Sequence, residues 1–308
     1  MSEKQKQFIS AVVYIHNGEQ YVEHFLQMLY GILSDNFERF EIICVNDHST
    51  DNSKQAIRDI ANSITGCMIS IVNTGFHQGI ESSMLAGLDL AIGDFVLEFD
   101  EAVIDYDPEI IMKCYNRCVE GFDVVSSGSG NRRGSSSLFY SLYNRHSGTQ
   151  HELKSETFRI ISRRGINRVY AMSPNPMYRK ALYQNCGLKT DYLEYETTGV
   201  ANRKHILKQP HETAVTSLIL FTNIAYKATI ILASIMMIFT LGSIIYTITV
   251  YIAGNPVEGF TTMMTLLSAA FFALFIILAV VIKYLSVILK LVFQKQRYTL
   301  ESVEKLTG

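Results

Sequence analysis

Apolar residues in the first 130 positions fall into short runs separated by segments with helical spacing. The runs are FISAVVYI (8–15), FEIICV (40–45), CMISIV (67–72), GDFVLEF (93–99) and FDVVSSG (122–128). After the first run, Val22, Phe25 and Leu26 begin a pattern that returns every three or four residues, as one face of a helix does. Strands alternating with helices predict an α/β fold with a Rossmann-like, mostly parallel and doubly wound sheet.

Polar residues follow three of these predicted strands directly. They are His16-Asn17, Asn46-Asp47 and Asp100-Glu101. Because ligands of such sheets bind beyond the carboxyl ends of the strands, we expect the three pairs to share one edge and form one site.

The C-terminal third of the chain has a different pattern. No charged residue occurs from Ala228 to Val257 or from Phe260 to Ile282, and each run exceeds the roughly 20 residues that span a bilayer as a helix. Buried core helices of this length would keep a polar face. We therefore expect two transmembrane helices, at about 228–253 and 260–282. The short link GNPVEG (254–259) would join them into a hairpin.

Lys and Arg residues flank this hairpin on both sides, whereas its link carries only Glu258. By the positive-inside rule, both ends face the cytoplasm, and we expect a multi-pass protein of the inner or plasma membrane with a cytoplasmic catalytic domain. The segment LILFTNIAY is suited to interfacial docking or to contacts between copies of the chain. The predicted organisation is a globular domain (1–212), an interfacial helix (213–227), the hairpin (228–291) and a cytoplasmic tail (292–308).

Composition excludes several classes of protein. The net charge is −2 without a basic stripe, which argues against a nucleic-acid partner. Five cysteines, an odd number, argue against a disulfide framework, and no second pair completes a zinc set with Cys114 and Cys118. The first strand is not followed by GxGxxG, and no P-loop sequence occurs, so a dinucleotide enzyme or a P-loop ATPase is disfavoured.

Four segments, SAVVYIHNGE, EIICVNDHSTDNS, HQGIESSMLAGLDLAIGDFVLEFD and FRIISRR, resemble in order and spacing the family 2 glycosyltransferases with the GT-A fold. The polyprenyl-phosphate subgroup, which includes dolichol-phosphate mannose synthase-like enzymes, is the most similar, since SSLFYSLYNRHSG, the hairpin and KQRYTL also resemble its members. The resemblance covers nearly the whole chain. It implies transfer of a sugar from a nucleotide-sugar donor to a polyprenyl phosphate, with inversion at the anomeric carbon.

The resemblance also implies a set of donor-binding residues. Asp47 matches the family's base-binding Asp, and the remaining candidates are Ile15, Asn17, Glu19, Ser49 and Gly79. Each has a purely structural alternative. Asp47 could be a turn acid, Ser49 a helix cap and Glu19 a first-turn helix acid, while Gly79 could simply permit a turn.

The acids in FDEAVIDYD (99–107) match the family's D-x-D motif, whose carboxylates bind a divalent cation. Here Ala102 replaces the second Asp, so Asp100 is the expected ligand of Mg²⁺ or Mn²⁺. A single carboxylate with donor phosphates and water can hold Mg²⁺. Alternatively Glu101 or Asp105 supplies a second oxygen, or the acids merely end a strand at the surface.

Arg159 and Arg163 of FRIISRR are candidates for contact with the diphosphate or with the lipid phosphate, because a guanidinium matches phosphate oxygens; solvation at the surface is the alternative. The resemblance places catalysis at Asp100, Glu101, Glu156 and Arg159. The family's acid before Phe-Arg is Thr157 here, which leaves Glu156 as the base candidate. The competing functions are transfer to a hydroxyl of a lipid-linked oligosaccharide, which requires a base, and binding without turnover.

Overall fold

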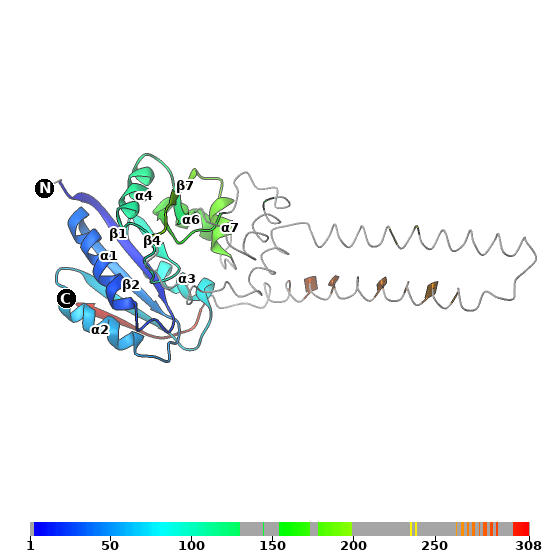
Figure 1. Ribbon diagram of the computed structural model, residues 1–308, viewed down its shortest axis with the longest axis horizontal. Coiled ribbons are helices and arrows are strands. Elements are labelled where there is room, and N and C mark those ends of the chain that lie inside the picture. Colours follow the sequence, from blue (N-terminus) through cyan, green and yellow to red (C-terminus); the bar gives the residue numbers. More distant parts are fainter. Residues whose placement is uncertain are drawn as a thin grey trace, which may run out of the picture. The chain divides into compact units, whose positions relative to one another are not determined.

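The computed structural model describes residues 3–129, 154–172, 178–198 and 298–307, together with Asn144 and scattered positions between Ile235 and Ile288. The chain divides into two compact units. The first comprises Met1–Asn144, Thr149–Thr213 and Gln296–Gly308, and the second comprises Arg145–Gly148 and Ala214–Lys295. Every strand and helix named below belongs to the first unit (Figure 1).

The amino-terminal half of this unit has the predicted alternation of strands and helices. The elements are β1 (Gln5–Ile15), α1 (Val22–Asn36), β2 (Phe37–Asn46), α2 (Ser53–Ser63), β3 (Met68–Thr74), α3 (Ile80–Leu90) and β4 (Phe95–Phe99). β1 pairs in parallel with β2 and β4, and β2 pairs in parallel with β3. The α/β class and the parallel pairing of these strands are therefore confirmed.

The second half differs from the prediction. It contains α4 (Glu109–Val119), β5 (Val124–Ser129), β6 (Phe158–Ser162), α6 (Arg163–Met172), α7 (Arg179–Gln184), β7 (Thr190–Tyr195) and β8 (Leu300–Thr307). The sheet order is β7-β5-β6-β4-β1-β2-β3-β8. β5 pairs in parallel with β7, whereas β6 runs antiparallel to both β4 and β5 and β8 runs antiparallel to β3. The sheet is therefore mixed, with antiparallel strands at β6 and β8 that the sequence did not predict.

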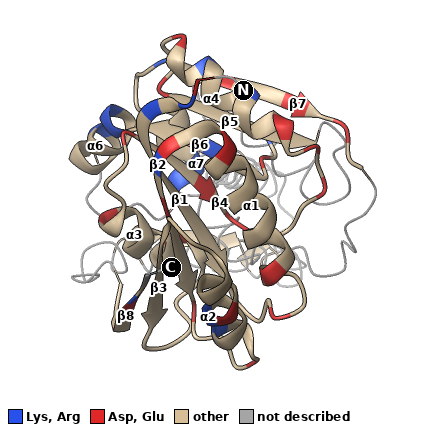
Figure 2. Ribbon diagram, turned by 90° about the vertical axis from the view of Figure 1, so that its left-hand side faces the viewer, with Lys and Arg blue, Asp and Glu red and all other residues tan. Residues whose placement is uncertain are grey.

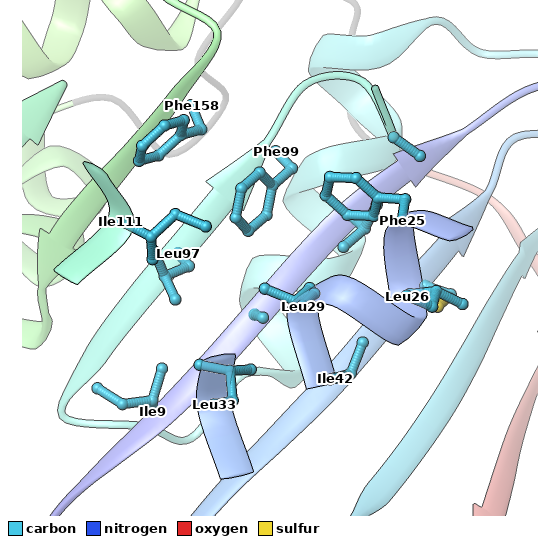
Figure 3. Packing of buried hydrophobic residues seen from close by; sticks show 14 of the residues in the cluster. Ile9, Phe25, Leu26, Leu29, Leu33, Ile42, Leu97, Phe99, Ile111 and Phe158 are labelled. Atoms are coloured by element: carbon cyan, nitrogen blue, oxygen red, sulfur yellow. The ribbon is translucent and has the colours of Figure 1, made fainter. Parts of the chain in front are cut away.

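One face of the sheet packs against α1, α2 and α4. Figure 3 shows Phe25, Leu29 and Leu33 of α1 lying over strand residues such as Ile9 and Phe99. These residues are almost completely buried. Leu29 and Leu33 lie four positions apart, and helical geometry puts such residues on one side of the helix. Burial of this apolar stripe supplies the main driving force for the helix to fold onto the strands.

The opposite face is covered by α3 at very close range. A Cβ on Gly87 would lie 2.4 Å from Val12 Cγ1 and 2.6 Å from Val45 Cγ2, so only glycine allows this approach. The close contact fixes α3 against β1 and β2, and it thereby fixes the amino end of α3 at the carboxyl edge of the sheet.

The predicted tail contains an edge strand that the sequence analysis did not predict. β8 pairs with β3 from Met68↔Thr307 to Thr74↔Leu300. Glu304 on β8 binds Lys54 and Arg58 of α2, with N–O distances of 2.8 Å to each. The tail thus covers the β3 edge, which would otherwise present unpaired backbone groups.

Among the residues that the structure describes, no helix combines the length and the apolar character needed to cross a membrane. The predicted interfacial helix (213–227) lies outside the described residues, and so does the hairpin (228–291) apart from isolated positions.

Candidate active site

The strand register brings the predicted polar segments to one edge of the sheet. Ile15 pairs with Asn46, and Val13 pairs with Phe99, so β1, β2 and β4 end side by side in the same direction. His16-Asn17, Asn46-Asp47 and Asp100-Glu101 extend from these ends. The expectation of a shared edge is confirmed.

Asp47 is fully buried at this edge and accepts an unusually large number of hydrogen bonds. Its Oδ1 accepts from the Thr74 hydroxyl and the Gln78 amide, and its Oδ2 accepts from the Tyr14 hydroxyl and the Gly79 amide, each at 2.9 Å. Burial alone would raise the pKa of Asp47, but these hydrogen bonds outweigh it and lower the pKa below its ordinary value. The carboxylate therefore holds the loop between β3 and α3 against the end of β1.

Gly79 is the last residue of this loop. Its φ of 83° lies in the left-handed region, which favours glycine. No atom lies within 4 Å of the position that a Cβ would occupy. The backbone here is accessible to a ligand, as the resemblance to the family implies.

Asn17, Glu19 and Ser49 join the two loops that follow β1 and β2. The Asn17 amide donates to Ser49 Oγ at 3.0 Å, and Asn17 Oδ1 accepts from the Thr50 amide at 2.8 Å. Glu19 Oε2 accepts from the Asn52 amide at 2.9 Å. Ile15 contributes a core side chain, and its carbonyl accepts from the Asp47 amide at 2.9 Å. The structure brings these predicted residues together as supports of the loops at the site.

Two histidines lie beside Asp47: His16, from the predicted polar pair after β1, and His77, which the sequence analysis did not single out. His77 Nδ1 is 2.9 Å from Asp47 Oδ2, and His16 Nδ1 is 2.7 Å from the Asp47 backbone oxygen. Their rings are tilted by 33°, with centroids 4.2 Å apart. They add a flat surface to the wall of the site.

Asp100 lies beyond the end of β4, among cations from two other elements. Its Oδ2 accepts from Arg159 Nη2 at 2.6 Å and lies 3.5 Å from Lys180 Nζ, while its Oδ1 accepts from Arg179 Nη2 at 3.1 Å. Arg159 comes from β6, whereas Arg179 and Lys180 come from α7. Burial alone would raise the pKa of Asp100, but the three cations outweigh it and hold the pKa well below its usual range.

Glu98 provides a second anchor for the two arginines from within β4. It is fully buried and accepts from Arg159 Nη1 at 2.6 Å, from Arg179 Nη1 and from the Tyr183 hydroxyl. Acidic and basic residues of β4, β6 and α7 lie close together in Figure 2. An acid inside the apolar run FVLEF was the sequence signal for this cluster, since a buried carboxylate requires a partner.

Other predicted residues lie at varying distances from this cluster. Glu156 contacts Arg159, with 3.1 Å between Oε1 and Nη2, so the base candidate is ion-paired. The structure does not bring Arg163 to the site: its guanidinium donates to the carbonyls of Ala91 and Gly93, at the amino end of β4. Glu101 follows Asp100 directly, and its charge acts on Tyr21: burial raises the pKa of that phenol and Glu101 raises it further.

The contacts of Asp100 do not fit those of a metal ligand. A carboxylate offers about four acceptor positions, and protein cations take three of them at Asp100: Arg159 and Lys180 at Oδ2 and Arg179 at Oδ1. Ala102 is buried and has no ligand atom, and Asp105 accepts a 2.8 Å hydrogen bond from Tyr195. No group of three His, Cys, Asp or Glu residues able to hold a metal occurs in the described part of the chain.

Several known proteins are similar to this chain. An uncharacterized glycosyltransferase of Synechocystis is 27% identical over 195 residues, which cover 61% of this chain and 60% of the relative. The bactoprenol glucosyl transferase of Shigella phage SfX is 26% identical, with 62% of this chain and 64% of the relative covered. An undecaprenyl-phosphate 4-deoxy-4-formamido-L-arabinose transferase of Pseudomonas paraeruginosa is 31% identical, with 41% and 37% covered.

The match spans about three fifths of the length of the first of these relatives. Among solved structures, the mannosyltransferase PcManGT from Pyrobaculum calidifontis in complex with GDP-Man and Mn²⁺ aligns with a TM-score of 0.47 and 14% identity, covering 62% of this chain and 55% of that chain.

Residues 10–187, more than half of the 308 residues, match the family described as "Glycosyl transferase family 2". The matched region contains β1 from Ser10 onward, β2 to β4, the loop after β2 that begins at Asp47 (the Asp47 loop) and the ion-paired cluster around Asp100. The chain belongs to glycosyl transferase family 2.

Proposed function

We propose that this protein is a membrane-anchored, inverting glycosyltransferase that moves a sugar from a nucleotide-sugar donor to a polyprenyl phosphate at the cytoplasmic leaflet. The observation that carries the proposal is the family match across the whole candidate site. The names of two relatives, a bactoprenol glucosyl transferase and an undecaprenyl-phosphate transferase, support a lipid phosphate as the acceptor.

The shared edge of the sheet suits a donor that combines a nucleoside with a diphosphate. The Asp47 side of the edge carries the histidine rings and the accessible Gly79 backbone, which suit a base and a ribose. The Asp100 side carries the cations that would face phosphate oxygens. A donor lying along the edge would extend from the first group of residues to the second.

In the proposed reaction, an oxygen of the acceptor phosphate attacks the anomeric carbon of the sugar. The bond between that carbon and the donor phosphate oxygen breaks, and the nucleoside diphosphate leaves with the electron pair. A phosphate monoester is already anionic near neutral pH, so the step needs little help from a general base. The ion pairing of Glu156 with Arg159 is compatible with such an acceptor. A hydroxyl acceptor would need a stronger base.

The membrane part of the proposal is supported by side chains in the C-terminal unit. Large apolar residues that are helical and exposed include Ile235, Ile238, Met263, Leu267, Leu274, Val281, Leu285 and Ile288. Exposed apolar side chains at so many positions favour a lipid environment over water.

The decisive experiment uses the purified full-length protein with radiolabelled nucleotide sugars. We expect label to move to undecaprenyl phosphate and not to a lipid-linked oligosaccharide, and NMR of the product should show an inverted anomeric centre. Transfer to the oligosaccharide alone would replace the proposed acceptor, and no transfer to either would favour binding without turnover. For topology, trypsin should digest the globular unit in inside-out vesicles and leave it intact in spheroplasts.

A further inference from the structure

We propose that Lys180, held in place by Asp100, supplies the positive charge that stabilises the donor diphosphate, in the role that a divalent cation has in relatives with a complete D-x-D motif. The inference deepens the proposed function and rests on it. It concerns how the charge that builds up on the departing nucleoside diphosphate is balanced.

Protein cations occupy the carboxylate of Asp100. Arg159, Arg179 and Lys180 all lie within 3.5 Å of its carboxylate oxygens. A divalent cation bound to the same oxygens would be only a few ångströms from three like charges. Coulomb repulsion at such distances is strong in a poorly hydrated site. Asp100 is therefore built to hold protein cations.

The three cations differ in the exposure of their side chains. The side chains of Arg159 and Arg179 are 0% and 1% exposed and bind both Glu98 and Asp100, so they are locked within the protein. Lys180 and Asp100 keep 8% and 13% exposure. Lys180, whose Nζ also donates to the Glu156 backbone oxygen at 3.3 Å, is thus the least buried of these three cations, and it is the one that we place beside the donor phosphates.

The cluster also lies close to the β3–α3 loop, which Asp47 holds in place. Arg179 binds Glu81 in the first turn of α3, with 2.9 Å between Nε and Oε2, and it binds Asp100 at the end of β4. α3 begins directly after Gly79, whose amide is bound to Asp47. The cluster thus lies beside the amino end of α3, where the helix dipole also favours a phosphate.

The test measures binding of UDP and GDP, with UMP and GMP as references, to the full-length protein in detergent by calorimetry. In excess EDTA, the wild-type protein should still bind one of the two diphosphates, and Mn²⁺ should change the dissociation constant less than about threefold. Labelled sugar transfer should also continue in EDTA. Loss of both binding and transfer in EDTA, with recovery in Mn²⁺, would overturn the inference.

Substitutions test Lys180 itself. Lys180→Met should weaken diphosphate binding by roughly tenfold or more, the scale of a contact with a charged group, and should weaken monophosphate binding much less. Lys180→Arg should restore most of the loss. Lys113→Met, on the exposed side of α4, is the matched control and should bind like wild type.

Monophosphate binding also shows that the Lys180→Met protein is folded. Equal diphosphate affinity for Lys180→Met and wild type would overturn the role of Lys180. Failure of every nucleotide to bind, with or without Mn²⁺, would instead overturn the proposed donor site and this inference with it. Normal diphosphate binding without transfer to any lipid acceptor would contradict the proposed function while leaving the assignment of Lys180 intact.

Discussion

Asp47 and Asp100 are both buried carboxylates at the carboxyl edge of the sheet, but their partners differ in kind. Asp47 accepts mainly from neutral donors, the hydroxyls of Tyr14 and Thr74 and two backbone amides. Asp100 is surrounded by three cationic side chains. Neutral donors fix a loop without cancelling the carboxylate's charge, whereas cations cancel it and are themselves held in place.

Under the proposed function, we expect the two halves of the site to have different roles. The Asp47 half is organised by backbone geometry, which suits recognition of the shape of a nucleoside. The Asp100 half is organised by charge, which suits the stabilisation of a leaving diphosphate. Substitutions should therefore have different consequences in the two halves.

The largest effect is expected for Asp100→Asn. The change keeps the shape of the side chain but leaves three buried or nearly buried cations with one carboxylate fewer. Breaking a buried ion pair in this way costs about 3–5 kcal/mol of unfolding free energy, and transfer should fall on the order of 100-fold. Urea unfolding and the radiolabel assay measure the two quantities.

Glu101→Gln is the matched control for Asp100→Asn, because Glu101 is the next residue and its charge acts on Tyr21. This variant should have nearly the same unfolding free energy and transfer activity as the wild type. If Asp100→Asn left stability and transfer at wild-type values, the cations would not depend on Asp100, and the contrast between the two carboxylates would disappear.

A smaller effect, on binding rather than on charge, is expected for Asp47→Ala. The variant loses the anchor of the loop that carries Gln78 and Gly79, and it loses the carboxylate predicted to contact the base. Nucleotide affinity should fall by about 1.5–3 kcal/mol, the scale of a hydrogen bond to a charged group. Thr74→Val removes one neutral donor and should cost less. Unchanged nucleotide affinity in a folded Asp47→Ala protein would show that Asp47 stabilises a turn and does not contact the base.

The origin of the partners explains why one half was easier to predict from sequence. The Asp47 loop lies within a region of three regular strand–helix units, and its motif NDHSTDNS is continuous in the chain. Both features can be recognised in the sequence. Arg179 and Lys180 lie 79 and 80 positions after Asp100. Adjacent charges in a short helix are usually solvated, and only the folded position of α7 brings Arg179 to Glu98 and Asp100 and Lys180 to Asp100.

β8 was missed for a different physical reason. Its apolar residues Leu300, Val303 and Leu306 recur every three positions, which is not the two-residue period of a strand. The half-buried face instead consists of Ser302, Glu304 and Leu306. A strand whose inner face is partly polar gives no clear alternation, so the tail could be recognised as a strand only from its pairing with β3.

Low pH should affect both carboxylates in the same direction. The pKa values of Asp47 and Asp100 are lowered in the folded protein, so each contributes stability that is fully present above the unfolded-state value of about 3.9. This stability should be lost as pH falls from that value toward the folded pKa. Urea midpoints measured from pH 6 downward should show the loss, and Asp100→Asn should lose less than wild type. A midpoint independent of pH in this range would contradict the charged state of both groups.

The smallest effect is expected at the far edge, where Glu304→Gln removes the ion pairs to Lys54 and Arg58. Both partners are about a third exposed, and such pairs contribute about 0.2–1 kcal/mol because water and salt screen them. Glu301→Gln, an exposed change on the same strand, is the control and should have no effect. Nucleotide affinity should be unchanged in both variants, since the charge of Glu304 acts on α2 rather than on Asp47. A loss of several kcal/mol of unfolding free energy, or a weaker nucleotide affinity, would contradict this expectation. Either result would show that β8 supports the Asp47 loop through its contacts with Asn73. The neutral half of the site would then depend on a distant charge as well.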